Sequence, residues 1–198
     1  SEMCIRDRLA TAPPQQSIQM LSSMAANMRP EIYKATLGKL YASGQGRTAA
    51  TAGALAPFNP QAAEGILRGQ IALKENPLLA PKKTDSNNAE IDTLLPTSAM
   101  APGYETSRQF LLDSATARYA DLSQQAGDTS GELNSDRMQQ AITEVTGGLL
   151  EMNGAPVVAP VYGMKQDEFD KRLSQLTDQD LAGAITSSGQ RVSVRDLM

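Results

Sequence analysis

The sequence has 198 residues, enough for one domain of ordinary size or for one domain with a smaller helical appendage. Its formal charge is −4, from 18 basic and 22 acidic residues, and the basic residues are scattered rather than clustered. Binding to phosphates needs a basic face, so we expect no direct nucleic-acid site. No run of about 18 apolar residues occurs, so we expect no transmembrane segment.

The core has to be built largely from small and aliphatic side chains. Aromatic residues make up 4% of the chain, and tryptophan is absent. Small side chains bury little area each, and burial contributes roughly 25 cal/mol per Å² of apolar surface. We therefore expect modest stability for the isolated chain, with dependence on a partner or on further sequence.

The first eight residues, SEMCIRDR, stand apart from the rest. They resemble a translated sequencing adapter that recurs at the ends of metagenomic reading frames. We expect residues 1–8 to be an artefact attached to a fragment of a larger protein. Excluding them removes Cys4, the only cysteine, and leaves a remainder with neither cysteine nor histidine.

Residues 15–75 show helical periodicity interrupted by prolines, and we expect an N-terminal helical subdomain there. Pro30 ends the first helix, because proline lacks a backbone donor and clashes with the preceding turn. Asn59 followed by Pro60 is a strong start signal, a cap residue before proline at the first helical position. The expected helices are residues 15–28, 31–43, 48–56 and 60–75.

Gly65 and Gly69 lie four apart within the last of these helices. They would permit close approach of a neighbouring helix. Glycine costs roughly 1 kcal/mol relative to alanine inside a helix. We therefore favour the plainer interpretation, in which both are tolerated surface glycines of a marginal helix.

Residues 76–103 contain four prolines and the polar run KKTDSNN. This composition predicts a linker with one helical turn at residues 90–95, and a boundary between two subdomains. Residues 104–198 then form a C-terminal helical subdomain, which begins with the longest expected helix, residues 105–125.

Two further helices are expected in this subdomain, followed by a last short helix that Thr177 caps, with Asp180 three residues on as in a capping box. Asn134 or Ser135 caps the first, which ends before the Gly147-Gly148 pair. The second starts at Gln166.

A β-hairpin is expected between these two helices, at residues 149–159. Asn153-Gly154 is the strongest two-residue hairpin signal, and Pro156 confines the second strand to a short or edge pairing. Residues 185–194 can form a second small hairpin. The predicted fold class is mainly α, a helical domain with one or two small β-hairpins in the C-terminal third.

Most catalytic chemistries are excluded by residue content. Without histidine, and with Cys4 set aside, neither a nucleophilic triad nor a Cys/His zinc site can form. No GxxxxGK[ST] or GxGxxG motif occurs, so phosphate-binding loops have no support. We predict no catalytic, cofactor-binding or metal-binding residues and no cofactor.

One acidic cluster contains the oxygen ligands that a calcium site needs. It consists of Asp128, Glu132, Asn134 and Asp136, close to Gly131. Their oxygens suit Ca²⁺, but the spacing does not follow the EF-hand alternation that ends in a bidentate glutamate. Helix entry and turn chemistry are the favoured interpretation.

Glu105 is the one carboxylate worth testing as a catalytic acid, because glycoside cleavage needs a protonated carboxyl group. Lytic transglycosylases place a glutamate followed by serine near a helix end, and then a Gly-Leu-Met-Gln-like motif. Here Thr106 follows, and no such motif occurs downstream. A negative charge in the first turn of a helix is the better account of Glu105.

The segment 127–184 resembles a part of large bacteriophage internal-virion, ejection or tail-associated proteins. The residues that carry the resemblance read GDTSGELNSDR, AITEVTGGLLEMNG and PVYGMKQDEFDKRLSQLTDQDLAGA. The upstream pieces NPQAAEGILRGQIALKENP and FLLDSATARYADLSQQAGDTSG are similar to the helical part that precedes it in those proteins. The resemblance covers roughly residues 37–198 and includes no active-site motif.

The resemblance implies a structural or DNA-delivery-associated role in a phage virion, as a non-catalytic segment of a larger polypeptide. Partners would be other virion proteins, or further copies of the chain, and the location would be the virion, or otherwise the cytoplasm. One alternative is a fragment of a peptidoglycan-degrading virion enzyme with Glu105 as the acid. Another is a generic helical interaction module that binds through Met20, Met24 and Met28, although core packing is the commoner use of such a stripe.

Overall fold

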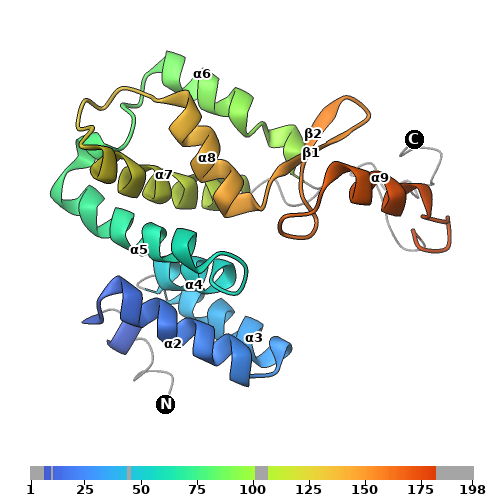
Figure 1. Ribbon diagram of the computed structural model, residues 1–198, viewed down its shortest axis with the longest axis horizontal. Coiled ribbons are helices and arrows are strands. Elements are labelled where there is room, and N and C mark those ends of the chain that lie inside the picture. The colour runs from blue at the N-terminus through green and yellow to red at the C-terminus, as the bar shows by residue number, and fades with distance from the viewer. Residues whose placement is uncertain (1–6, 10, 44–45, 101–106, 182–198) are drawn as a thin grey trace.

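The computed structural model describes residues 7–9, 11–43, 46–100 and 107–181, and it is mainly helical (Figure 1). Within these ranges, one two-stranded antiparallel sheet lies in the C-terminal third. The predicted fold class is therefore confirmed. The second hairpin, expected at residues 185–194, lies outside the described residues.

The N-terminal half folds as predicted into helices separated by prolines and glycines. Proline occupies the first helical position of three of them, where its missing N–H group is not needed. Asn59 caps the last, and its side-chain oxygen accepts a hydrogen bond from the N–H of Ala62 at 3.0 Å. The helices are α2 (Pro14–Asn27), α3 (Pro30–Ala42), α4 (Arg47–Leu55) and α5 (Pro60–Glu75).

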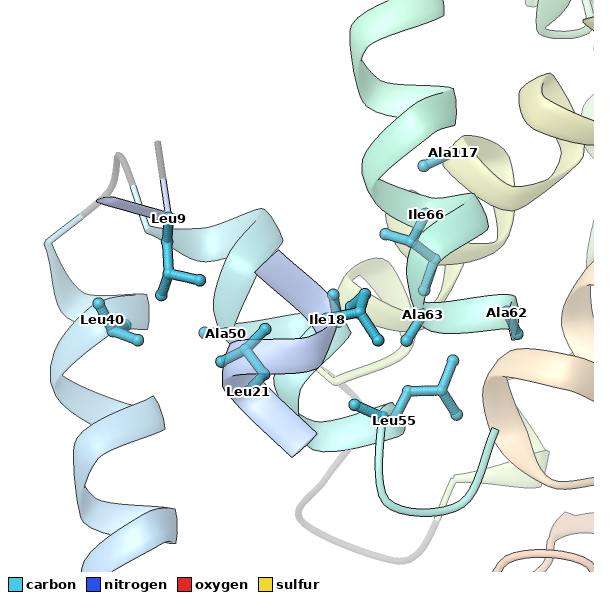
Figure 2. Packing of buried hydrophobic residues seen from close by; sticks show 12 residues of the cluster. Leu9, Ile18, Leu21, Leu40, Ala50, Leu55, Ala62, Ala63, Ile66 and Ala117 are labelled. Carbon is cyan, nitrogen blue, oxygen red and sulfur yellow. The ribbon is translucent and has the colours of Figure 1, made fainter. Parts of the chain in front are cut away.

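The first core lies between these helices (Figure 2). Leu21 of α2 and Ile66 of α5 are almost completely buried, and Leu55 packs in the same cluster. Tyr33 adds a polar link, because its hydroxyl donates to the Gly53 carbonyl oxygen at 2.7 Å. Alanines fill much of the remaining space, as the composition indicated.

The methionine stripe of α2 lies half-buried at the edge of this core. Met20, Met24 and Met28 are all of intermediate exposure, and Met20 packs against the first core. Packing therefore accounts for Met20. A partner-binding role for the stripe stays a prediction.

The stretch expected to be a linker, residues 76–103, contains more helix than predicted. Where one turn was expected at residues 90–95, the structure has the ten-residue helix α6 (Asp85–Leu94). The polar run supplies its cap, since Thr84 Oγ1 accepts a hydrogen bond from the N–H of Asn87 at 3.2 Å. Leu79 and Leu95 are buried on either side of α6. The short 3₁₀ helices η1 (Pro77–Leu79) and η2 (Thr97–Ala99) flank it.

A second core forms between α7 (Ser107–Ala126), α8 (Ser135–Thr146) and the α6 region. Tyr119, Met138, Ile142 and Leu95 are nearly inaccessible there. Asn134 is the cap of α8, and its side-chain oxygen accepts from the N–H of Arg137 at 3.0 Å. The division into two subdomains stays a prediction. Helix α5 of the first expected subdomain packs along α7 of the second.

The predicted hairpin is confirmed as β1 (Leu149–Met152) paired with β2 (Ala155–Val158). Asn153 and Gly154 have φ angles of 54° and 76°, as a two-residue type I′ turn requires. Pro156 stands opposite Glu151 in this short pairing. The helix α9 (Gln166–Ser174) follows and contacts β1.

Helices α5 and α7 cross at the two glycines of α5. Gly65 and Gly69 are buried, and both face α7. A Cβ atom on Gly69 would lie 1.7 Å from the Ala117 carbonyl oxygen, which no real pair of atoms tolerates. The preferred interpretation as surface glycines is therefore wrong, and close helix approach is what they permit. Sequence alone did not show which helix would lie against this face.

No helix in the described ranges combines the length and apolarity needed to cross a bilayer.

The crossing makes opposite predictions for two glycine-to-alanine substitutions. Gly69→Ala should lower the free energy of unfolding by about 3 kcal/mol, because the new methyl group meets backbone and must push α7 away. Gly38→Ala, on the exposed face of α3 with nothing within 4 Å of its Cβ position, should raise it by about 0.5–1 kcal/mol. Urea unfolding of both variants measures this. Equal effects would contradict the close crossing.

Candidate functional site

A network of charged side chains joins α5, α7 and α8. Asp121 of α7, 2% exposed, accepts from Arg118 Nη1 at 2.6 Å and from Arg68 Nε and Nη2 of α5 at 2.8 and 3.0 Å. Arg118 also donates from Nε to Glu144 of α8 at 2.5 Å. Arg68 donates from Nη1 to Glu64, one turn earlier, at 2.5 Å. Each arginine thus lies between two carboxylates.

This network stabilises the helix crossing and leaves its charges paired. The hydrogen bond from Arg68 to the Asp121 carboxylate raises the pKa of the Arg68 guanidinium above its ordinary value. In the described part of the chain, every buried side-chain nitrogen or oxygen has a hydrogen-bond partner. We therefore interpret the network as a structural connection between helices and not as a reaction site.

The loop between α7 and α8 is held by Asp128. Its Oδ2 accepts from Arg137 Nη1 at 2.8 Å, and its Oδ1 accepts from the N–H and the hydroxyl of Ser130 at 3.1 and 2.8 Å. The bond from Arg137, and then those from Ser130, lower the pKa of Asp128 to about 2. Asp128 is therefore the fixed carboxylate around which this turn is built.

The other three residues of the acidic cluster considered for calcium make separate contacts. Glu132 lies 3.2 Å from Lys82 Nζ, and Asn134 caps α8. Tyr119 links them, because its hydroxyl donates to the Glu132 carbonyl at 3.1 Å and accepts from the Asn134 N–H at 3.0 Å. Asp136 is an exposed first-turn residue of α8. Among the described residues, no three cysteine, aspartate or glutamate side chains gather as a metal site would require.

Glu105, the one carboxylate considered as a catalytic acid, lies outside the described residues. α7 is described from Ser107 onward, close to the predicted helix.

A groove runs over α5 between α4 and α7, and we call it the α4–α7 groove. Its apolar end has a volume of about 450 Å³. Ile66 of α5 is 1% exposed and forms the floor between the two flanking helices. None of the described residues that line this end is charged, and they include Ala54, Leu55, Phe58, Leu111, Val145 and Tyr162.

Two apolar side chains project from the rim of the apolar end. Phe58 is 61% exposed and Val161 is 47% exposed. Phe58 stacks on Tyr162 with ring centroids 5.4 Å apart and an interplanar angle of 18°. The Tyr162 hydroxyl in turn donates to the Glu144 carbonyl at 2.6 Å and accepts from Asn59 Nδ2 at 3.1 Å. The Phe58 ring is thus both solvent-exposed and held in place.

The second, more polar end of the groove has a volume of about 420 Å³. Thr51, Ile66 and Phe110 line both ends, so the two hollows are adjacent. Polar side chains join the lining here, among them Thr48, Gln70, Ser114 and Thr116.

Two opposite charges stand on facing walls at the polar end. Arg47 belongs to α4, and its guanidinium lies 5.3 Å over the centroid of the Tyr41 ring. Asp113 belongs to α7 and accepts from Gln109 Nε2 at 2.8 Å. Neither Arg47 nor Asp113 forms a salt bridge with another described residue.

Neither the charged network nor the groove was predicted from the sequence. Arg68 and Asp121 are 53 residues apart, and helical periodicity placed neither of them inside. One signal was present in Gly65 and Gly69, which bracket Arg68 and mark the face that meets α7. The groove had no such signal, because its walls come from four separate stretches of chain.

Comparisons with protein-family models, with curated proteins and with solved structures find no match for this chain.

Removal of the central charge should destabilise the fold. Asp121→Asn keeps the shape but replaces one acceptor oxygen with an NH2 group that faces the donors of Arg68 and Arg118, so the free energy of unfolding should fall by about 3 kcal/mol. Asp136→Asn is the matched control, since this carboxylate is exposed and should cost less than about 1 kcal/mol. Chemical denaturation compares them. Equal losses would contradict the network's structural role.

The Asp128–Arg137 pair predicts a pH dependence. Because Arg137 and Ser130 hold the pKa of Asp128 at about 2, below its ordinary 3.8, the carboxylate stabilises the folded state above about pH 4. That contribution is lost as the pH falls through about 2. The stability difference between wild type and Asp128→Asn should therefore be constant above about pH 5 and shrink toward about pH 2. Denaturation at several pH values measures it, and a gap independent of pH would refute the pairing.

Proposed function

We propose that this chain is a non-enzymatic structural or DNA-delivery-associated segment of a phage virion protein, and that it works by protein–protein contact. The assignment to a virion rests on the resemblance of residues 127–184 to internal-virion, ejection and tail-associated proteins. The contact role rests on one structural observation, the α4–α7 groove with its projecting Phe58.

The groove has the features of a protein-contact surface. Aromatic anchors carry much of the binding energy at protein–protein interfaces. Phe58 supplies such an anchor, because it is exposed and already ordered by stacking on Tyr162. An ordered anchor loses little conformational entropy when it binds.

The segment that carries the resemblance takes part in this surface. Residues 160–162, within the matching run PVYGM, supply Val161 and Tyr162 to the groove. Tyr162 fixes this wall to α5 and α8 through its bonds to Asn59 and Glu144. The segment that carries the resemblance therefore supplies one wall of the proposed contact surface.

The genes beside the reading frame that encodes this sequence test the virion assignment. We expect portal, capsid or tail genes as neighbours, and the protein itself in purified particles of the phage that carries the gene, as detected by mass spectrometry. Metabolic neighbours would contradict the proposal.

Zymography on peptidoglycan tests the non-enzymatic part. The purified chain should produce no clearing, with a phage lysozyme as positive control. Clearing that disappears in Glu105→Gln would replace the structural role with that of a peptidoglycan-degrading enzyme.

A further inference from the structure

We propose that the occupant of the α4–α7 groove is a second copy of this chain, in a two-fold symmetric dimer whose axis runs along the groove. This inference deepens the proposed function and rests on it in one respect, the use of the groove as a protein-contact surface.

The apolar end carries both halves of a self-complementary contact. In a two-fold interface the same patch meets itself, so it has to contain a projecting group and a hollow that receives it. Phe58 projects from the turn between α4 and α5, and the hollow beside it is lined by Leu111 and Val145 from α7 and α8. Rotation about an axis along the groove places each Phe58 over the opposite wall of the other copy.

The polar end carries charges that become complementary under the same rotation. Arg47 stands on the α4 wall and Asp113 on the α7 wall, and neither has a salt-bridge partner among the described residues. A two-fold axis between the walls exchanges them. Arg47 of each copy then faces Asp113 of the second copy, which gives two ion pairs per dimer.

This charge pattern favours a second copy over an unrelated partner. A purely apolar partner segment would fit the apolar end but would leave Arg47 and Asp113 unmatched. A second copy supplies the apolar surface and both opposite charges at the required positions. The groove is modest in size, so we expect a weak dimer, with a dissociation constant on the order of tens of micromolar.

Charge reversal tests the proposal in the full chain. Sedimentation velocity over a wide concentration range, with reductant present to exclude cross-linking through Cys4, should show a reversible monomer–dimer equilibrium. Arg47→Glu and Asp113→Arg should each weaken dimerisation at least about tenfold, because both ion pairs become repulsive. These positions are exposed or at the rim, and circular dichroism checks that both variants stay folded.

The decisive experiment mixes the two single variants, Arg47→Glu and Asp113→Arg. In a heterodimer, Arg47→Glu of one chain meets Asp113→Arg of the other, and the unchanged Arg47 and Asp113 meet as well, so both pairs are attractive again. The equimolar mixture should therefore dimerise about as strongly as wild type. A mixture as weakly associated as its components would overturn the proposed geometry.

Phe58→Ala tests the apolar half, and it should weaken dimerisation on the order of 30-fold. Ile71→Ala is the matched control, because Ile71 is an exposed apolar residue of α5 that does not line the groove, and it should change nothing. A wild-type chain that stays monomeric up to about 1 mM, well above the expected affinity, would overturn the dimer. If that monomer were encoded among capsid or tail genes, the proposed function would still stand.

Discussion

The structure depends on the close crossing of α5 and α7. Gly69 brings the α5 backbone against the Ala117 carbonyl oxygen, and Gly65 leaves the space that the Arg118 and Asp121 side chains occupy. Two helices packed this closely bury backbone and charged groups together, so the gain from burial depends on complete pairing of those groups. Arg68 completes the pairing across the interface. The crossing and the ion network therefore occupy the same place in the fold.

The same crossing determines the groove. α5 forms its floor, while α4 and α7 pack on α5 from either side without packing extensively on each other. The distance between the two walls is thus set by how closely α7 approaches α5. Residues 160–162 form a third wall, and Tyr162 fixes it to α5 and α8 through its hydrogen bonds to Asn59 and Glu144. A chain with few aromatic residues places four of them along this surface: Tyr41, Phe58, Phe110 and Tyr162.

Local signals in the sequence predicted the local structure well. Asn59-Pro60 marked the start of α5 and Asn153-Gly154 marked the hairpin turn, because both depend on backbone chemistry within a few residues. The α6 helix was underestimated, since its polar residues and the prolines on either side of it suggested a linker. Leu95, just after α6, gains its burial from distant parts of the chain. The ion network was missed for the same reason. A buried arginine becomes favourable only when a carboxylate from another helix is present, and no periodicity shows that.

Native-state hydrogen exchange tests the central claim most directly, because it reports the opening free energy of each helix separately. Backbone amides of α5 and α7 near the crossing, around residues 66–72 and 115–121, should exchange slowest and only through global unfolding. Those of α2 and α9 should exchange through smaller, local openings. Faster exchange in α5 and α7 than in α2 would contradict the account, because the crossing would then not be the most stable part of the fold.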